Sequence, residues 1–345
     1  MYQLFITTVP ARDQKASIPM KHHLVYLLAF FVTMSTASTN VLAAPGLESP
    51  TTPNQSSEKQ SATSQSKNPW LGPELLYSTY KTMQPRLQNN AFGEPFSLDA
   101  HVFDELTLGD VYAEVPYKYD LLANTLTVPN QLCHAIMLHI NVKGCVIEDS
   151  DQRKPLMDLY VGRKEYQHPE NAFKVQYKFS VNDHRDNYTL VSMTADKGPL
   201  RTENIAIYIE FLAVDSQTSF IHFAYTANYG GLARFALNTY LATLGRNKVG
   251  FSETGVDEHG EPVYIKGIQG VVERNTMRYF FALDSYFSTY SQPEKQRFDA
   301  SLNRWFDYVE KYPKQLYKVP RDEYLKAKHK ERADIGELIP PSKES

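Results

Sequence analysis

The stretch that most constrains the fold is a long helical pattern near the C-terminus, between Ile265 and Tyr290. Its apolar and aromatic residues recur three or four positions apart, the spacing that places side chains on one face of an α-helix. The residues of this stripe are Ile268, Val272, Asn275, Tyr279, Ala282 and Tyr286, with Leu283 beside them. A helix with such a face needs a broad apolar surface to pack against.

The sequence before this helix predicts a sheet that provides that surface. Apolar and polar residues alternate from Phe173 to Val181, and the segments 188–195, 205–211 and 220–229 repeat the alternation, with turn-forming residues between them. Because successive side chains of a strand point to opposite faces, the pattern is typical of an antiparallel sheet with one buried face. Shorter strands are predicted at 96–103, 111–119, 135–147 and 156–162. We therefore expect an α+β fold in which an antiparallel sheet wraps around one long helix.

Other helices are predicted before and after the strands, at 69–88, 119–132, 232–244, 293–312 and 321–332. Pro129 would interrupt the second of these helices or begin another one. The segment 247–262 is polar, and we expect a loop there with a turn at 257–260. The last helix carries Lys326, Lys328, Lys330 and Arg332, which are most simply a solvated face. Transient contact with a membrane surface is the alternative for this helix, although it offers few apolar residues for insertion.

The N-terminal residues have the order of an export signal. Lys21 precedes an apolar run from Leu24 to Met34, and small residues follow as far as Ala43. We expect residues 1–43 to be an upstream extension and a secretory signal, with Met20 a better start than Met1. Residues 44–70 are rich in Ser, Thr, Pro and Gln and predict a disordered linker. We expect a folded domain at 71–335, a flexible tail at 336–345, and a periplasmic or secreted protein.

The chain has two cysteines, Cys133 and Cys145. An exported chain meets an oxidising compartment, so we expect one disulfide that ties the end of a helix to a neighbouring strand. Two free thiols are the alternative. One cysteine pair does not make a metal site, and His134 and His139 would face opposite sides of a strand. We therefore expect no metal. The formal net charge of −3 is too small to predict a nucleic-acid partner.

Four stretches of the sequence carry a resemblance to a known family. They are LHINVKGC at 138–145, HFAYTANYGGLARFALNTYLATLGRNKVGF at 222–251, GVVERNTMRYF at 270–280 and RWFDYVEKYPKQL at 304–316. In these stretches the chain resembles exported bacterial START-like proteins of the helix-grip, SRPBCC type. The order of its elements from about Glu94 to Tyr290 resembles the same fold. The resemblance implies a curved sheet around the long helix, with extra C-terminal helices, and an apolar cavity between sheet and helix. It implies no established activity.

Six residues are expected to face that cavity as ligand-binding residues: Tyr177, Tyr225, Asn275, Arg278, Tyr279 and Tyr286. Asn275 is the most informative, because a buried amide needs hydrogen-bond partners. One hypothesis is that Asn275 and Arg278 orient the head group of a ligand. The alternatives are a structural hydrogen bond from Asn275 to backbone, and pairing of Arg274 and Arg278 with carboxylates at the surface.

The resemblance favours a binder of a hydrophobic small molecule or lipid over an enzyme. No catalytic residue and no cofactor is predicted. His222 has no nucleophile next to it in the sequence, so a Ser-His-Asp arrangement is neither supported nor excluded. An enzyme of cyclase or hydrolase type that uses the same pocket is one alternative. A scaffold whose added helices dock a protein partner is another.

Overall fold

The structure is a computed structural model that describes residues 69–148, 155–243 and 245–338. The predicted secretory signal, and nearly all of the predicted linker and tail, lie outside these residues. The described part belongs to one compact unit of the chain. The last helix continues to Leu338, a few residues into the predicted tail.

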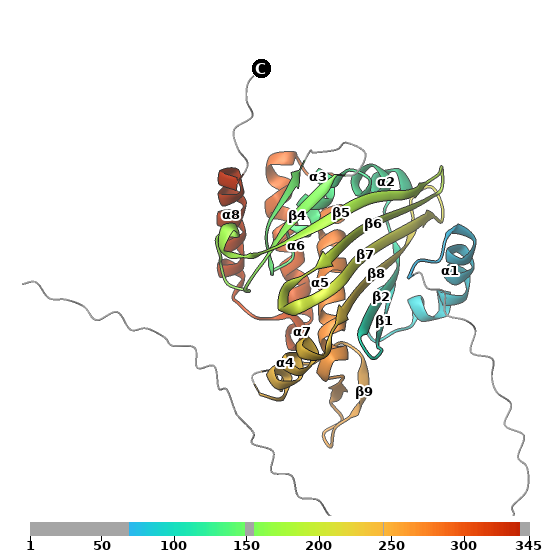
Figure 1. Ribbon diagram of the computed structural model, residues 1–345. Coiled ribbons are helices and arrows are strands. Elements are labelled where there is room, and N and C mark those ends of the chain that lie inside the picture. The colour runs from blue at the N-terminus through green and yellow to red at the C-terminus, as the bar shows by residue number, and fades with distance from the viewer. Residues whose placement is uncertain (1–68, 149–154, 244, 339–345) are drawn as a thin grey trace, which may run out of the picture. The chain divides into compact units, whose positions relative to one another are not determined.

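Eight strands form a single antiparallel sheet in the order β1-β2-β8-β7-β6-β5-β4-β3 (Figure 1). The strands are β1 (Phe96–Val102), β2 (Leu106–Val115), β3 (Val142–Glu148), β4 (Leu156–Val161), β5 (Phe173–His184), β6 (Tyr188–Lys197), β7 (Thr202–Ala213) and β8 (Ser219–Tyr229). Consecutive strands from β3 to β8 pair with one another, and the β1–β2 hairpin adds to the sheet beside β8.

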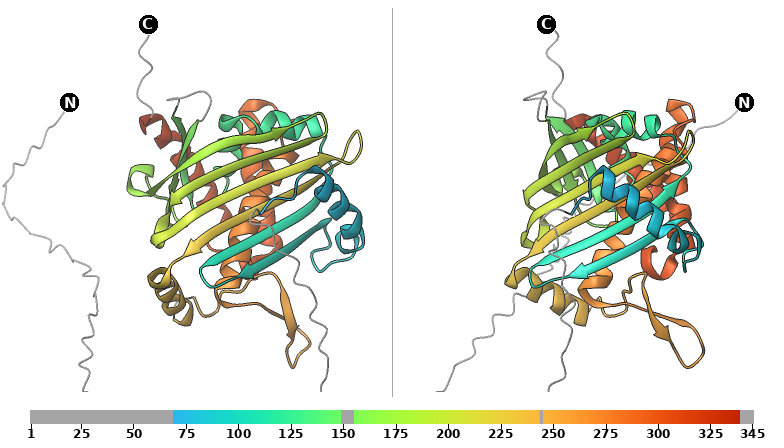
Figure 2. Two further views of the ribbon diagram at one scale, coloured as in Figure 1. Left: turned by 45° about the vertical axis from the view of Figure 1, so that its right-hand side comes forward. Right: turned by 90° about the vertical axis from the view of Figure 1, so that its right-hand side faces the viewer.

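Helix α5 (Gly267–Ser288) crosses one face of this sheet, which we call the inner face (Figure 2, left). Its buried aromatic residues, among them Phe280, Phe281 and Phe287, pack into the main hydrophobic core. The helix approaches β2 so closely that a Cβ atom at Gly109 would overlap Thr276 Oγ1 and lie 3.1 Å from Val272 Cγ1. The predicted fold, a curved antiparallel sheet around a long C-terminal helix, is confirmed by this arrangement.

The other helices surround α5 or cover the outer face of the sheet. Helices α2 (Tyr119–Leu126), α3 (Pro129–Ile136), α6 (Glu294–Lys311), α7 (Pro313–Leu316) and α8 (Arg321–Leu338) lie on the side of α5 (Figure 1). Helix α4 (Gly231–Ala242) follows β8, and β9 (Glu253–Val256) pairs with β10 (Pro262–Tyr264) before α5. Helix α1 (Pro73–Gln88) packs Leu76, Tyr80 and Leu87 on the outer face (Figure 2).

The structure corrects three expectations about local structure. The strand predicted at 135–147 begins only at Val142, because Pro129 starts a second helix that runs to Ile136. His134 therefore lies in a helix, and His139 lies in the turn that follows it. The polar segment 247–262 contains β9 and the first residue of β10, a hairpin that the sequence pattern did not predict.

The predicted solvated face of the last helix is wrong for Lys328, which is 1% exposed. Its Nζ atom donates to the backbone oxygen atoms of His139 and Val142, and it lies 3.0 Å from Glu331 Oε2. Helix α8 thus packs against β3 through buried charges. The sequence of the helix does not reveal the two backbone partners, because His139 and Val142 are almost 190 residues away in the sequence.

Candidate functional site

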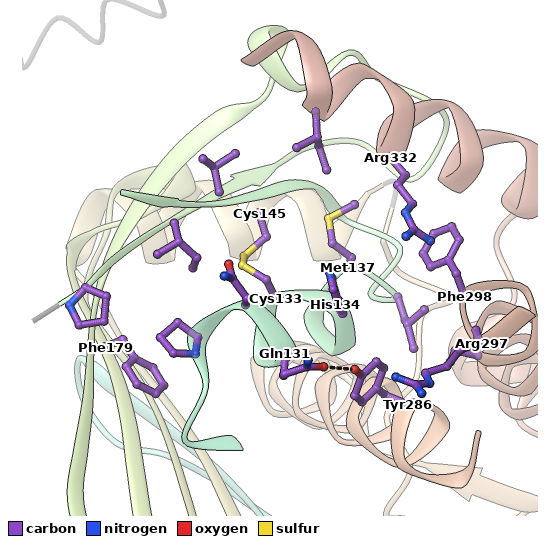
Figure 3. Close-up of a pocket in the computed structure, with 18 of the residues that line it drawn as sticks. Gln131, Cys133, His134, Met137, Cys145, Phe179, Tyr286, Arg297, Phe298 and Arg332 are labelled. Carbon is purple, nitrogen blue, oxygen red and sulfur yellow. Dashed lines mark hydrogen bonds between the residues drawn. A yellow bond between two sulfur atoms is a disulfide. The ribbon is translucent and has the colours of Figure 1, made fainter. Parts of the chain in front are cut away.

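The disulfide between Cys133 and Cys145 is present and joins α3 to β3, with the two Cα atoms 5.5 Å apart. This is the link between a helix end and a neighbouring strand that the sequence predicts. Both cysteines line a cavity of about 1020 Å³ (Figure 3). The disulfide therefore supports one wall of this cavity.

The cavity lies between α3, the strands β3 and β5, and the helices α6 and α8. Its apolar wall includes Met137, Leu138, Ile147, Phe179 and Ile335. Strand β5 places Phe179 and Val181 two positions apart, and both border the cavity although Phe179 is buried and Val181 is exposed. A volume of this size is at the upper end of the range of pockets for small organic molecules, about 300–1,000 Å³.

Polar and basic groups occupy the side of the cavity next to α6 and α8. Tyr286, the only contribution of α5 to the lining, donates a hydrogen bond to Gln131 Oε1 at 2.5 Å. Figure 3 shows Arg297 beside Tyr286, and the guanidinium group of Arg297 lies over the ring of Tyr290 at 4.4 Å. Arg332 lies over the ring of Phe298 at 4.3 Å. The cavity thus has a basic side as well as an apolar wall.

The charges at this basic side are not fully balanced by the lining. Glu294 is the one carboxylate among the described lining residues, which also include Arg297 and Arg332. The Nε atom of Arg297 is buried and has no hydrogen-bond partner within the described residues. Burial lowers the pKa of His134, and the nearby Arg332 and Arg297 lower it further, so this imidazole is neutral at neutral pH. An anionic group would gain attraction from both arginines there.

Little space is left between the sheet and the C-terminal half of α5. A void of about 10 Å³ lies there, lined by Val115, Ile209, Phe280 and Phe287 among others. Such a void is no larger than a single water site. Aromatic residues of α5 fill this region, so the large cavity lies beside α5, where the added helices α6 and α8 meet α3.

Of the six predicted ligand residues, Tyr286 lines the large cavity and the other five do not. Tyr279 stacks on His139 with ring centroids 4.4 Å apart and lies 5.9 Å from Tyr225. Burial raises the pKa of Tyr177, Tyr225 and Tyr279, so these phenols stay protonated. Their role in ligand binding stays a prediction.

Asn275 is half-buried, and its amide influences the pKa of both His139 and Tyr225. Burial and the nearby cations Arg278, Lys328 and Lys143 lower the pKa of His139, and the interaction with Asn275 opposes this effect. Burial raises the pKa of Tyr225, which the interaction with Asn275 lowers. The amide therefore has polar side chains as neighbours inside the domain.

The expectation that Arg274 and Arg278 pair with carboxylates at the surface is wrong, because both side chains are buried. Arg274 Nη1 donates to the backbone oxygen of Val249 at 2.7 Å. The Nε and Nη2 atoms of Arg278 have no hydrogen-bond partner in the part of the chain that the structure describes. Trp305 of α6 packs over this turn of α5, and its Nε1 donates to the backbone oxygen of Arg278.

His222 lies on the outer face of the sheet, away from the cavity. Its Nδ1 is 2.7 Å from Glu210 Oε1 and its Nε2 is 2.9 Å from Asp110 Oδ1. Burial alone would lower the pKa of His222, but the hydrogen bonds and charges of Asp110 and Glu210 raise it above its usual value. Since both ring nitrogens contact carboxylates, neither is available to accept a proton from a serine. Glu210 also accepts hydrogen bonds from the backbone N–H groups of Leu71 and Gly72, just before α1.

Within residues 69–148, 155–243 and 245–338, no group of three or more His, Cys, Asp or Glu side chains is placed to hold a metal ion. No helix in the described part of the chain is both long and apolar enough to cross a bilayer.

Sequence reasoning missed most of the polar lining of the large cavity. Gln131, Arg297 and Arg332 come from three helices that are far apart in the sequence. For Arg332 the sequence predicted a solvent-exposed position, because this residue belongs to a run of charged residues in the last helix. The amphipathic pattern of α6 was visible, but nothing in it distinguishes Arg297 from its other charged residues.

No protein-family model matches this chain, and no curated protein is similar to it in sequence. Among solved structures it is similar to human STARD10, with 9% identity over 71% of this chain and 91% of that one, at a TM-score of 0.33. It is also similar to human StAR-related lipid transfer protein 5, with 10% identity over 50% of this chain and 88% of that one, at a TM-score of 0.29. Norcoclaurine synthase from Thalictrum flavum is 14% identical over 42% of this chain and 90% of its own, at a TM-score of 0.31. Because these identities and TM-scores are low, the fold is assigned from the strand order and the position of α5, and not from the similarity to these structures.

Proposed function

We propose that this protein binds an amphipathic small molecule or lipid in the cavity between α3, β3, β5, α6 and α8. The observation that carries the proposal is the cavity itself, with a volume of about 1020 Å³, an apolar wall and a basic side. The apolar part of the ligand would lie along Met137, Ile147 and Phe179. Its polar or anionic end would lie near Arg297 and Arg332, where a charge-assisted hydrogen bond has its best donors.

We also propose that the protein works outside the cytoplasm, in the periplasm or as a secreted binder. The apolar run from Leu24 to Met34 and the small residues after it support export. The Cys133–Cys145 disulfide is consistent with an oxidising compartment. A carrier of this kind would contact a membrane only transiently, to take up or release its ligand.

The first test asks whether a ligand occupies the cavity. The full chain is purified under native conditions, weighed by native mass spectrometry, and extracted with organic solvent to identify bound molecules. We expect an adduct on the protein, or uptake from a panel of fatty acids and phospholipids. A protein that carries no adduct and binds no member of the panel would overturn the proposal.

A variant that narrows the cavity tests whether the ligand binds there and not elsewhere. Val181 lines the cavity and is 41% exposed, so Val181→Trp can narrow the cavity without disturbing the core. Val263 in β10 is 39% exposed and does not line the cavity, so Val263→Trp is the matched control. We expect Val181→Trp to retain less ligand than the wild type and Val263→Trp to retain the same amount. Equal retention by the two variants would contradict the assigned site.

The basic side of the cavity is tested by charge. The double variant Arg297→Gln with Arg332→Gln should weaken an anionic ligand about tenfold or more, since one hydrogen bond to a charged group contributes about 1.5–3 kcal/mol. Lys295→Gln on the exposed side of α6 is the control, and its affinity should match the wild type. An unchanged affinity in the double variant would show that the two arginines do not bind the ligand.

A further inference from the structure

Five basic residues from four segments meet beside the middle of α5, and we call them the cation cluster. They are Lys164 after β4, Lys248 after α4, Arg274 and Arg278 of α5, and Lys318 between α7 and α8. Burial lowers the pKa of Lys164 to about 7, and Arg278, Lys248 and Lys318 contribute to this shift by repulsion. Burial and the neighbouring Arg278, Lys248 and Arg274 likewise lower the pKa of Lys318 to about 8. These effects indicate that the five groups lie within range of one another's charge.

The cation cluster has little negative charge to balance it. None of its five members forms a salt bridge with a carboxylate among the described residues. Glu273 is the carboxylate that acts on Arg274, but its Oε2 atom accepts the backbone N–H groups of Phe251 and Ser252. Lys248 donates to the hydroxyl group of Tyr240. A protein interior does not gather cations in this way without a cost, because like charges repel and burial removes their hydration.

Arg278 is a buried member of the cluster with two donor atoms that are unpaired in the described part of the chain. Arg278 is only 6% exposed, and its Nε and Nη2 atoms have no hydrogen-bond partner within the described residues. These two atoms form one edge of the guanidinium plane, the edge that binds two oxygens of a carboxylate or phosphate at once. A buried donor that lacks a partner is destabilising, so the edge is suited to an anion that arrives from outside.

We propose that the cation cluster is a binding site for a phosphate group, held by the Nε–Nη2 edge of Arg278 and by the ammonium groups of Lys164, Lys248 and Lys318. A phosphate suits the cluster better than a carboxylate, because its oxygens point in several directions, towards donors from several segments. Of the cluster, Lys164 also lines a second cavity of about 340 Å³, and the other charged residues of that lining are Glu165, Glu323, Lys326 and Lys330.

This inference goes beyond the proposed function, because none of the five residues lines the large cavity. The phosphate could belong to inorganic phosphate or a small phosphorylated molecule, or to the head group of a phospholipid. In both cases the shared chemistry is a phosphate group that carries one or two negative charges and is bound by Arg278.

The test measures the thermal stability of the full chain in a phosphate-free buffer. Inorganic phosphate is added in one arm, and vesicles of phosphatidylcholine with or without phosphatidic acid are added in the other. Sodium chloride at matched ionic strength is the reference in every arm. We expect the midpoint of unfolding to rise with inorganic phosphate if the ligand is small, or only with phosphatidic acid vesicles if it is a head group. No rise in either arm would overturn the proposal.

Arg278→Gln assigns the effect to the cluster. This variant should bind phosphate at least about tenfold more weakly in calorimetric titration, which corresponds to the loss of one charge-assisted hydrogen bond. Arg246→Gln, an exposed arginine two positions before Lys248, is the control and should bind as the wild type does. Equal affinity of Arg278→Gln and wild type would refute the assignment.

Two further measurements keep the test decisive. If Arg278→Gln does not fold, the half-buried Lys164→Gln and Lys318→Gln variants should each weaken phosphate binding, and unchanged binding in both would refute the site. Arg278→Gln should also retain any molecule bound in the large cavity as the wild type does. This result separates the phosphate site from the proposed amphipathic ligand, so that either proposal can fail alone.

Discussion

Helix α8 is held against β3 by one carboxylate and two ammonium groups, all of them buried. Glu331 Oε1 accepts a hydrogen bond from Lys143 Nζ at 2.7 Å. Glu331 Oε2 lies 3.0 Å from Lys328 Nζ, as an ion pair without the alignment of a hydrogen bond. Lys143 also donates to the backbone oxygens of Ile140 and Glu165, both at 3.0 Å. One buried negative charge therefore balances two buried positive ones.

Glu331→Gln removes that negative charge and keeps the size of the side chain. Removing one partner of a buried ion pair costs about 3–5 kcal/mol, because the other charge stays buried without compensation. For a domain of this size, about 2–4 °C of melting temperature is lost per kcal/mol. We therefore expect the melting temperature to fall by about 6–20 °C, measured by circular dichroism, with a matching loss in urea unfolding.

The pH dependence of this variant has a defined sign. Burial lowers the pKa of Lys328 to about 8, and Glu331 opposes this effect. Without Glu331 the pKa of Lys328 falls further below its unfolded value of about 10.4. A base whose pKa is lowered by folding reduces the free energy of unfolding. The reduction is complete below the folded-state pKa, and it becomes smaller as the pH rises towards the unfolded-state pKa. Glu331→Gln should thus recover part of its stability between about pH 8 and pH 10.

Two control variants separate the network from the helix. Glu323→Gln, on the exposed face of the same helix, should change stability by no more than about 0.5 kcal/mol. Lys328→Met leaves Lys143 and Glu331 as a balanced pair, so it should cost less than Glu331→Gln. The reasoning is refuted if Glu331→Gln is no more destabilising than Glu323→Gln, or if Lys328→Met is the more damaging of the two buried changes.

Two other predictions concern the sheet. The pKa of His222 is raised in the fold, so its contribution to stability is complete below about pH 6.5 and is lost as pH rises through the raised value. His222→Gln should therefore cost more free energy of unfolding at about pH 6 than at about pH 9; urea titrations with equal losses at both values would contradict this. Gly109→Ala places a Cβ atom against Thr276 Oγ1 and should destabilise by about 1–3 kcal/mol. Adding Thr276→Ala should restore part of that loss in thermal unfolding, and no recovery would show that the contact is not the cause.

The strands and the long helix could be predicted from the sequence because their signals are local. The alternation from Phe173 to Val181 lies within β5, and the helical spacing from Ile268 to Tyr286 lies within α5. Each pattern reports the face that its own element buries, whatever it is buried against. The boundary between α3 and β3 was missed because Ala135 and Ile136 are buried in the helix and apolar like the strand that follows.

The candidate site was predicted less well, since it depends on where separate elements meet. The sequence placed the ligand residues on α5 and the facing strands, and only Tyr286 borders the large cavity. Aromatic residues of α5 fill the space beneath its C-terminal half. Helices α6 and α8 then add a wall, with Arg297 beside Tyr286 and Arg332 beside Phe298 (Figure 3).

By itself, the sequence determined most of the strands and helices, the α+β class, and the cysteine pair that forms the disulfide. Periodicity and residue chemistry act over a few neighbours, so they can be recognised in a linear chain. Only the tertiary structure decided that Lys328 is a buried ion-pair partner and that Lys164, Arg278 and Lys318 share one cation cluster. These features depend on long-range packing, because the charge and burial of each group are set by side chains from distant segments.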